Sequence, residues 1–587
     1  MMGTLTRSIR ELRENPQQWQ AFQQQGHCVV LAPPGSGKTK LLTTRLAYDL
    51  FNKIPPPHGA ACITLTNAAA AELRRRLDGL GVPNRSTLVV GTVHSFALRR
   101  VIAPFAALTD RPELAHASIA GDRQQTAAYA QAIDTVFGGR EDQRNIRSTI
   151  EFHRRRLSPE EAWLRSGEGI LEAGRLYGSL LREQGLIDFD DVVRIAVELV
   201  EDHEVVRRVL AARYPYLYVD EYQDLAPGLD RLVRALCFDD THEAQLFAVG
   251  DPEQAVFGWT GSRPELLTEL AALPGVHPVH LEHNYRCGAE IIRIANLIQR
   301  GEREVIPSRE GGEVSATRCP GGFADQCRRA VTTVRTAIGR GVPLHEIVVI
   351  CPHNSQCRDV TDALRNAGVP AFVRGSEYRL TQATSFVEAC AAWAALGREL
   401  SNYRLGAIHQ RWRQLLGLSW TREKDVALTE LLLDYEYKTH DGAHQLLADL
   451  LDLGLAQGLS RPSQSDEAAE VGKMRQELIS GALKDLTITG LAERARKVDR
   501  VEVTTMTSSK GLEFDVVLIL GADEKRMPDF RSFNAPTQLN EDRRKFYVSV
   551  TRARDEVRIF YSGFVEWASG RPDPAGPSRF LREIGLV

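Results

Sequence analysis

The stretch APPGSGKT, residues 32–39, decides the expected fold. An apolar run, VVL at residues 29–31, precedes it, and leucines at helical spacing follow it over residues 41–50. This order predicts a buried strand, a glycine-rich loop and a helix that begins at the loop. The unpaired N–H groups at the start of such a helix attract phosphate, because they lie at the positive end of the helix dipole. The stretch therefore predicts a phosphate cradle, and the flanking strand and helix disfavour the alternative of a chance loop.

The residue types of the cradle have expected tasks. Lys38 is placed to reach the β- and γ-phosphates of a nucleotide, and the Thr39 hydroxyl is placed to hold Mg²⁺. Pro33 has no N–H, and neither has the next proline, so the donors must come from the residues after them. The predicted nucleotide-binding residues of the loop are Pro34, Gly35, Ser36, Gly37, Lys38, Thr39 and Lys40.

Length and composition predict a multidomain soluble enzyme. At 587 residues the chain exceeds one hydrophobic core and suggests roughly three to five units. The net charge of -3 gives no global attraction to nucleic acid, so a polyanion site must be a local patch. Nine cysteines without a CxxC pair favour a reducing cytoplasm and argue against a zinc or iron–sulfur site. The polar start and the lack of an apolar run of about 18 residues predict that the protein is neither exported nor membrane-bound.

Two carboxylates follow another apolar run. PYLYVDEYQDL, residues 215–225, places Asp220 and Glu221 directly after a predicted strand. Asp220 can hold Mg²⁺ through water while Glu221 acts as the base that orients the attacking water. The alternative is a helix cap, but a pair downstream of a phosphate cradle favours catalysis.

Polar residues follow three further predicted strands. AACITLTN at 60–67 and TLVVGTVHSF at 87–96 end in side chains that can grip a sugar-phosphate backbone, although a lone histidine there is usually structural. QLFAVGD at 245–251 leads to Gln254, which is suited to sensing a γ-phosphate, and to aromatics that suit a stacking platform or, alternatively, a hydrophobic plug. The predicted DNA contacts of these segments are Thr64, Thr66, Asn67, Thr92, His94, Phe257 and Trp259.

Two segments suit recognition of adenine. HNYR at 283–286 supplies Tyr285, whose ring can stack on a base, and Arg286, whose fork can clamp phosphate. NPQQWQAF at 15–22 supplies Gln18, which can pair with the amino group and a ring nitrogen of adenine.

The order of the motifs resembles superfamily 1A helicases of the UvrD, Rep and PcrA type over nearly the whole chain. The segments are APPGSGKT, TLTNAAAAE, GTVHSF, DFDD, VDEYQD, VGDPEQAVFGW, LEHNYR, SSKGLEF and EDRRKFYVSVTRAR. The resemblance implies an α/β fold with two RecA-like parallel-sheet motor domains, each with a mainly helical insertion. The expected limits are 1–99 and 176–279 for motor domain 1A, 100–175 for insertion 1B, 280–380 and 494–587 for motor domain 2A, and 381–493 for a reduced insertion 2B.

The resemblance also implies residue roles. ATP lies between the motor domains, with Gln18 and Tyr285 on adenine, Glu513 on the ribose, and Glu221 as the catalytic base. Lys38, Thr39 and Asp220 hold the phosphates and Mg²⁺, while Gln254, Arg286 and Arg552 contact the γ-phosphate. Trp567 lies near the place of the family's aromatic wedge at a duplex junction; the alternative is a partly buried structural tryptophan.

The departures from the family pattern lie mostly on the DNA side. They are Leu65, Ala68, Thr260, Thr507 and His283, and they predict a weak grip on DNA and low processivity. The first function hypothesis is a 3′-to-5′ DNA translocase and helicase in repair or replication restart, which acts on single-stranded or tailed duplex DNA. The second is a DNA- or nucleotide-sensing ATPase that regulates a separately encoded nuclease, as in phage-defence systems such as Gabija. A small-molecule kinase is a third, because it shares the cradle but needs no SSKGLEF segment; no small-molecule substrate besides ATP is expected.

Overall fold

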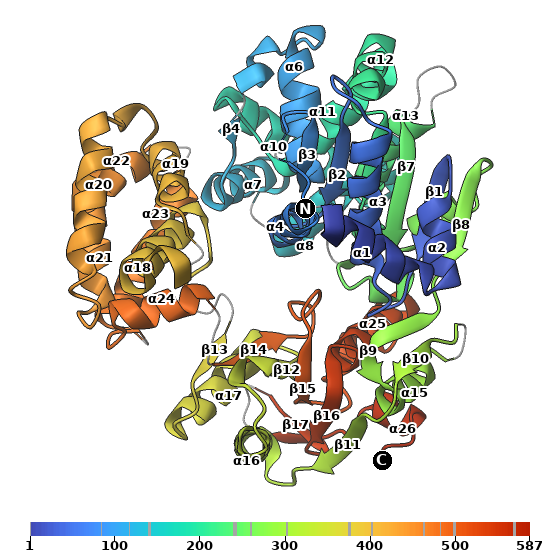
Figure 1. Cartoon of the computed structure of the whole chain (residues 1–587), viewed down its shortest axis with the longest axis vertical. Coiled ribbons are helices and arrows are strands. Elements are labelled where there is room, and N and C mark those ends of the chain that lie inside the picture. The colour runs from blue at the N-terminus through green and yellow to red at the C-terminus, as the bar shows by residue number, and fades with distance from the viewer. Residues whose placement is uncertain are drawn as a thin grey trace.

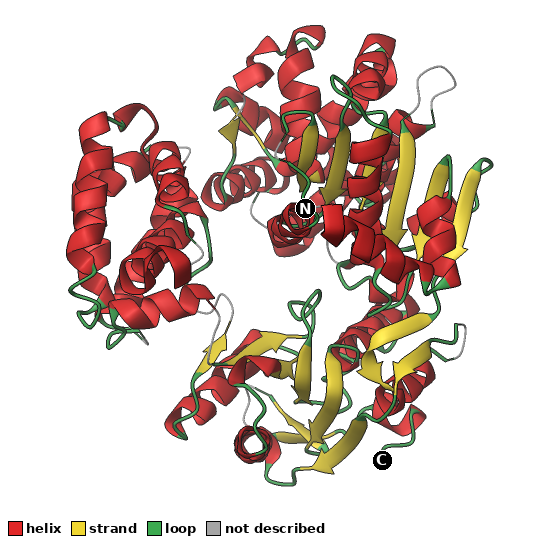
Figure 2. Cartoon of the chain, in the orientation of Figure 1, coloured by secondary structure: helices red, strands yellow, loops and turns green. Residues whose placement is uncertain are grey.

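The computed structural model describes residues 2–83, 85–116, 118–138, 143–238, 244–258, 261–300, 303–373, 377–400, 403–461, 464–481, 483–496, 500–567 and 571–587. The chain forms two RecA-like α/β domains, each built on a six-stranded parallel sheet, and a separate helical body lies to one side (Figures 1 and 2). The α/β fold predicted from the sequence is confirmed.

The first sheet has the strand order β3-β2-β6-β7-β1-β8, and every pairing is parallel. Short apolar strands with both faces covered are typical of parallel sheets. The carboxyl ends of the strands meet at one edge, where an open parallel sheet binds its ligands. The strands are β1 (His27–Leu31), β2 (Ala60–Thr64), β3 (Leu88–Thr92), β6 (Tyr216–Val219), β7 (Gln245–Gly250) and β8 (Val276–His280).

Helices cover both faces of this sheet, and each face has its own core. Val30 and Tyr218 point toward one set of helices, whereas their neighbours Val29 and Val219 point toward the other, as strand alternation requires. On the first face lie α1 (Met2–Arg13), α2 (Pro16–Gln23), α3 (Lys38–Asn52) and α4 (Asn67–Gly79). On the second lie α11 (Phe189–Asp202), α12 (Glu204–Arg213), α13 (Pro227–Cys237) and α14 (Glu265–Ala271).

A mainly helical segment separates β3 from β5 (Leu186–Ile187). Tyr129 and Tyr177 stack at its centre, with ring centroids 3.7 Å apart. It begins with α5 (Val93–Phe96), a π-helix (Ala97–Ile102) and α6 (Ala103–Phe105). It continues with two 3-10 turns (Ala106–Leu108 and Pro112–His116), β4 (Ser118–Ile119), which pairs with β5, and α7 (Asp122–Phe137), α8 (Gln143–Arg156), α9 (Glu160–Arg165) and α10 (Ile170–Glu183).

The second sheet has the order β11-β16-β15-β12-β14-β13, again parallel throughout. Its strands are β11 (Glu313–Arg318), β12 (Ile347–Cys351), β13 (Ala371–Val373), β14 (Val501–Thr505), β15 (Phe514–Ile519) and β16 (Ala553–Tyr561). Its helices are α15 (Ala289–Ile298), α25 (Pro536–Val550) and α26 (Arg579–Glu583) on one face, and α16 (Gly322–Gly339) and α17 (Asn354–Asn366) on the other. Two small ribbons flank it: β9 (His283–Gly288) with β10 (Ile306–Arg309), and β17 (Phe564–Glu566) with β18 (Pro572–Pro574).

The helical body lies between β13 and β14 in the chain. Trp412 is fully buried in its core and Trp393 nearly so, whereas Trp420 is partly exposed. The body touches the first helical segment, because the Asp466 carboxylate accepts a hydrogen bond from the Asp122 N–H at 2.6 Å. Its helices are α18 (Gln382–Leu400), α19 (Leu405–Leu416), α20 (Arg422–Tyr435), α21 (Ala443–Leu450), α22 (Ala456–Leu459), α23 (Ser465–Ile479) and α24 (Ile488–Arg496).

The cysteines and the helices add two further observations. All nine cysteines are free and buried. Across the described ranges, none of the helices combines the length and the apolar character that crossing a membrane requires.

Candidate nucleotide cleft and DNA groove

The glycine-rich loop joins β1 to α3 at the carboxyl edge of the first sheet. Gly35 (φ 68°) and Gly37 (φ 81°) have left-handed backbones that favour glycine. A Cβ on Gly35 would lie 2.7 Å from the Cβ of Arg286, so the loop also needs glycine for close packing. No side chain caps α3, which leaves its first N–H groups available to phosphate.

Lys38 points from the loop to the end of β6. Its Nζ lies 3.0 and 3.1 Å from the two carboxylate oxygens of Glu221. Burial by itself would lower the pKa of Lys38, but the carboxylates of Glu221, Asp220 and Asp251 together raise it. The lysine is therefore a fixed cation at the position where the phosphates of a nucleotide would lie.

The two predicted carboxylates lie in different electrostatic environments. Burial, and then the charge of Glu221, raises the pKa of Asp220 to about 7. Burial also disfavours the ionised form of Glu221, but Lys38 and Lys510 outweigh it and lower the pKa of Glu221 to about 2. Glu221 is thus ionised at neutral pH, as a general base must be, and the two carboxylates differ in how readily they bind a proton.

Arg552 approaches the cleft from the second motor domain. It is fully buried, and its Nη2 donates to Oε1 of Gln254 at 3.3 Å. Gln254 in turn donates to the carboxylate of Asp251 at 2.7 Å, so a polar chain crosses between the two sheets. Burial and the nearby Arg286 lower the pKa of Arg552 to about 10, which leaves it cationic at neutral pH.

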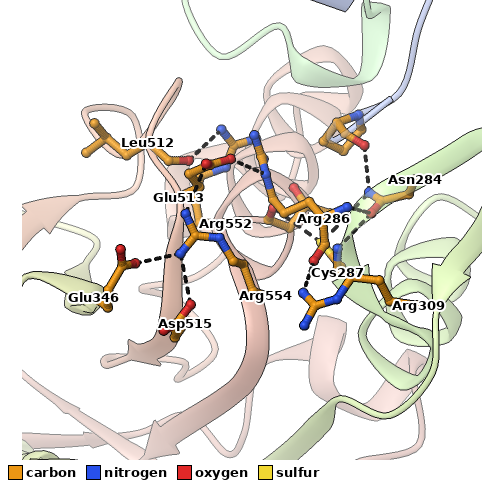
Figure 3. A network of polar contacts seen from close by, with 12 residues as sticks. Asn284, Arg286, Cys287, Arg309, Glu346, Leu512, Glu513, Asp515, Arg552 and Arg554 are labelled. Atoms are coloured by element: carbon orange, nitrogen blue, oxygen red, sulfur yellow. Dashed lines mark hydrogen bonds and ion pairs between the residues drawn. The ribbon is translucent and has the colours of Figure 1, made fainter. Parts of the chain in front are cut away.

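Arg286 and Glu513 form the outer part of the same cluster (Figure 3). Arg286 Nε donates to Glu513 at 2.9 Å, and Arg554 donates to the other carboxylate oxygen at 3.0 Å. Burial favours the neutral form of Glu513, but the two arginines outweigh it and lower its pKa. The predicted ribose contact is therefore an ionised carboxylate held between two guanidinium groups.

The predicted adenine contacts both lie against the phosphate loop. Gln18 donates its amide to the Ser36 carbonyl at 2.7 Å, and the Tyr285 N–H donates to the Gly35 carbonyl at 2.9 Å. The Tyr285 hydroxyl accepts a hydrogen bond from Asn15 at 2.7 Å, and its ring is partly exposed. Gln18 lies on α2 beside the first sheet and Tyr285 lies on β9 beside the second, so each motor domain supplies one residue to the expected position of the base.

Sequence reasoning missed Lys510, which lies in the turn after β14. Its Nζ donates to both carboxylate oxygens of Asp224, at 2.6 and 2.8 Å, and to the Gln254 carbonyl at 2.7 Å. Lys510 thereby fastens the second motor domain to the carboxylate segment of the first. The signal was present in SSKGLEF, where a lysine stands in a turn at the end of a parallel strand, but the sequence does not show how far the side chain reaches.

Four of the predicted DNA contacts line one cavity of about 520 Å³ between the first sheet and the first helical segment. We call this cavity the DNA groove, after the contacts that the sequence predicts for its residues. The ring of Phe189 also lines it, 5.3 Å from the His94 ring, and burial lowers the pKa of His94, which keeps it neutral. Phe189 is exposed and belongs to the DFDD segment, but no role was predicted for it from the sequence. The predicted residues in the groove are Thr66, Asn67, Thr92 and His94.

The local structure around these residues differs from the predicted loops. Thr66 and Thr92 cap α4 and α5, because their hydroxyls accept hydrogen bonds from Ala69 N–H at 3.2 Å and from Ser95 N–H at 3.1 Å. His94 therefore lies in the first turn of a helix and not on a strand-exit loop. A threonine directly before a helix satisfies an otherwise unpaired N–H group, which explains the abrupt change from strand to helix.

The other predicted DNA contacts lie elsewhere. Thr64 is only 1% exposed and does not line the groove, which argues against a DNA contact; the strand buries its side chain. Phe257 packs over the Lys510 ammonium group, 5.4 Å away, at the cleft between the motor domains. Trp259 lies outside the described residues. Trp567 follows β17 in the second motor domain and lines a separate cavity of about 510 Å³ with Phe530.

Comparisons with known proteins agree with this architecture. Residues 14–273 match the UvrD/REP helicase N-terminal domain, and residues 461–563 match the UvrD-like helicase C-terminal domain. The chain is 25% identical to the ATP-dependent DNA helicase Rep of Escherichia coli, over 98% of this chain and 94% of the relative. It is 23% identical to PcrA of Staphylococcus epidermidis (95% and 84%) and 26% identical to UvrD1 of Mycobacterium tuberculosis (97% and 85%).

The enzyme class that the fold, the cleft and these matches define is an ATP-dependent DNA helicase. Within that class, the chain belongs to the UvrD/Rep family.

Proposed function

We propose that the protein hydrolyses Mg²⁺-ATP to move along single-stranded DNA from 3′ to 5′ and to separate short duplexes. The observation that carries the proposal is the cleft built from both motor domains. Arg552 reaches Gln254 and Lys510 reaches Asp224, so the hydrolytic residues of one domain are completed by cations of the other. A site of this kind makes hydrolysis depend on domain closure.

The residues present fit Mg²⁺. This ion keeps several waters and usually takes one or two protein ligands besides substrate phosphates. Thr39 and Asp220 would hold it, and the described residues contain no group of three or more metal-ligand side chains, which a closed protein site would need. Bound Mg²⁺ would neutralise phosphate charge. The raised pKa of the buried Asp220 fits a carboxylate that lacks a sufficient positive partner without the ion.

The chain's own residues account for the remaining chemistry. When ATP binds, Lys38 would leave its ion pair with Glu221 and bind the phosphates instead. The Glu221 carboxylate would then be free to accept a proton from the attacking water. Arg286 and Arg552 would neutralise charge on the phosphoryl group during transfer, which is where such arginines act most strongly. Gln254, hydrogen-bonded to Arg552, would couple the phosphate position to the second motor domain.

We also propose the DNA path and the domain limits given in the sequence analysis. The DNA groove would hold the strand backbone through Thr66, Asn67 and Thr92, with His94 and Phe189 against the bases. The strands support the order of the domains, because those of the first sheet lie between residues 27 and 280 and those of the second between 313 and 561. Some of the limits fall inside elements: β8 ends one residue beyond 279, α10 crosses the limit at 175, and α24 crosses the limit at 493. A role in repair or replication restart in the cytoplasm stays a prediction.

A strand-displacement assay tests the proposal most directly. Duplexes with a 3′ tail, a 5′ tail or blunt ends would be incubated with the protein and ATP, and the ATPase rate would be measured in parallel with and without single-stranded DNA. The expected result is DNA-stimulated hydrolysis and displacement on the 3′-tailed duplex only. Displacement that prefers the 5′ tail would overturn the polarity.

The alternative, a DNA- or nucleotide-sensing subunit that regulates a partner nuclease, makes a different prediction for the same assay. The ATPase rate would then be indifferent to DNA and would respond to the nuclease. No contact among the described residues favours this alternative over the motor.

A further inference from the structure

A second groove lies in the first motor domain and is lined by residues on and next to α1, α2 and α3. Figure 1 shows these three helices side by side. We call this second groove the outer groove. It has a volume of about 570 Å³, and its floor is aromatic. Trp19 and Phe22 stack with centroids 5.2 Å apart and planes within 16°, and Tyr48 meets Phe22 edge-on at 5.3 Å. Trp19 and Tyr48 are partly exposed.

Cations surround this aromatic floor. The Arg13 guanidinium lies over the Trp19 ring, 4.6 Å from its centroid, and the Lys53 ammonium lies 5.8 Å from the centroid of Tyr48. Arg10 stands on the same turn of α1 as Arg13. No carboxylate lines the groove, and within the described ranges no carboxylate lies within ion-pair distance of Arg10 or Arg13. The charge of both arginines is therefore available to an anion.

The outer groove is separate from the nucleotide cleft, although α2 borders both. Gln18 turns toward the cleft and donates to the Ser36 carbonyl, whereas its neighbour Trp19 turns toward the groove. None of the residues of the outer groove lines the DNA groove or belongs to the predicted ATP site. The proposed function therefore leaves this aromatic and basic cluster without a task.

We propose that the outer groove is a second nucleotide-binding site, which takes one base and its phosphate. The stack of Phe22, Trp19 and Arg13 ends in a planar guanidinium group, and such planes stack readily on bases. Arg10 then faces the phosphate, Lys53 lies beside it while pairing with Asp49 at 3.2 Å, and the amide of Gln23 can reach a base edge. Aromatic rings combined with unpaired cations are the usual means of binding single strands and nucleotides, and a groove of this volume suits one nucleotide.

Photo-crosslinking tests the proposal and locates the site. One arm uses an oligothymidylate that carries a single 5-iodouracil, and the other uses 5-iodo-deoxyuridine monophosphate alone. After irradiation, the modified peptides of the whole protein are identified by mass spectrometry. We expect modification of Trp19 or Tyr48. A crosslink with both probes assigns the site to free nucleotides as well as strands, and a crosslink with the oligonucleotide alone assigns it to a strand.

The variant Arg10→Ala/Arg13→Ala should lower the Trp19 and Tyr48 crosslink at least about tenfold, because it removes both unpaired cations. The matched control is Arg7→Ala/Arg75→Ala, which removes two equally exposed arginines that lie outside the groove and pair with Glu11 and Glu72. Crosslinks elsewhere on the motor and the basal ATPase rate should stay unchanged in both variants, since neither touches the cleft. No crosslink at the outer groove, or one that persists in the Arg10/Arg13 variant, would overturn the proposal. Loss of DNA-stimulated ATPase would bear on the motor function and not on this site.

Discussion

The nucleotide cleft and the DNA groove differ in how their residues are held. In the cleft, Lys38, Glu221 and Arg552 are each fixed by charged or hydrogen-bonded partners, some of them from the opposite motor domain. In the groove, the hydroxyls of Thr66 and Thr92 accept hydrogen bonds from N–H groups in the first turns of α4 and α5. The exposed ring of Phe189 lies beside a neutral His94. The difference indicates which of the two sites tolerates change.

Phosphoryl transfer explains the rigidity of the cleft. The reaction is accelerated almost entirely by positioning and by charge neutralisation, so each charged group must be fixed before the substrate arrives. Contacts to a DNA backbone are many and individually weak, and the loss of one can be absorbed. Of the residues that depart from the family pattern, Leu65 lines the DNA groove, whereas His283 lies beside Tyr285, with ring centroids 6.3 Å apart.

Arg552→Ala should lower the ATPase kcat by about 10³ to 10⁵, the range of an arginine finger, with a smaller change in KM. The reason is that its charge matters most while the phosphoryl group is in transfer. Steady-state kinetics with Arg558→Ala as the control would show this, because Arg558 lies on β16, the strand that follows Arg552, and pairs with Glu556 and Glu313. An equal loss of affinity and turnover would make Arg552 a binding residue.

Glu221→Gln should lower kcat by about 10² to 10⁴ while ATP still binds, because the change removes a base and leaves the phosphate loop intact. Nucleotide affinity by fluorescence titration and turnover by phosphate release are the two measurements. Lys38→Ala serves as the comparison, since it should weaken both. Substantial turnover in the purified Glu221 variant would contradict the assignment of the base.

Lys510→Ala should lower DNA-stimulated turnover by about tenfold to a hundredfold, since it leaves the buried Asp224 without its charge-assisted partner. Adding Asp224→Asn to the Lys510→Ala variant should lower turnover little further, because the two substitutions remove the same interaction. The control is Lys525→Ala, whose partner Asp573 lies at the surface. Additive losses from the two cleft substitutions would show that Lys510 and Asp224 act independently.

The structure brings most of the residues predicted for the cleft together, but the sequence did not indicate the contacts between the two domains that hold them. Parallel strands end at one edge of a sheet. A glycine-rich loop after one strand and a carboxylate pair after another therefore predict where phosphates and the attacking water would bind. Lys510 and Asp224 stand 286 residues apart, and their ion pair depends on how two domains meet. No local pattern encodes that distance, so the contact appeared only in the structure.

The groove was predicted less well, for a physical reason. The prediction chose Thr64 because it ends a strand, but strand alternation and the covering helix bury its side chain. It overlooked Phe189, because an aromatic at the start of an amphipathic helix is usually a core residue, whereas here more than half of its surface is exposed. Whether such a side chain points to the core or to the groove depends on tertiary packing. The periodicity of apolar residues in a short segment does not determine it.

Phe189→Ala should weaken binding of single-stranded DNA about tenfold and leave basal ATP hydrolysis unchanged, since base stacking contributes about 1–3 kcal/mol per base. Fluorescence anisotropy with a labelled oligothymidylate measures the affinity. Phe51→Ala is the matched control, because Phe51 is equally exposed and lies at the far end of α3. An unchanged affinity would remove Phe189 from the DNA path.

Trp567→Ala should have the smallest effect, a loss of about fivefold in unwinding rate with DNA-stimulated ATPase preserved, which corresponds to one weak base stack. Trp567 follows β17, its indole N–H donates to Asp573 at 3.2 Å, and its ring meets Phe530 edge-on at 5.5 Å. This partly exposed ring lies outside both the cleft and the groove, as a wedge at a duplex junction would require. Trp420→Ala, with the same exposure in the helical body, is the control. Strand displacement and ATPase rates measured on the same 3′-tailed duplex separate the two roles: equal losses in both would assign Trp567 to packing, and a selective loss of displacement would place the duplex junction at the β17–β18 ribbon.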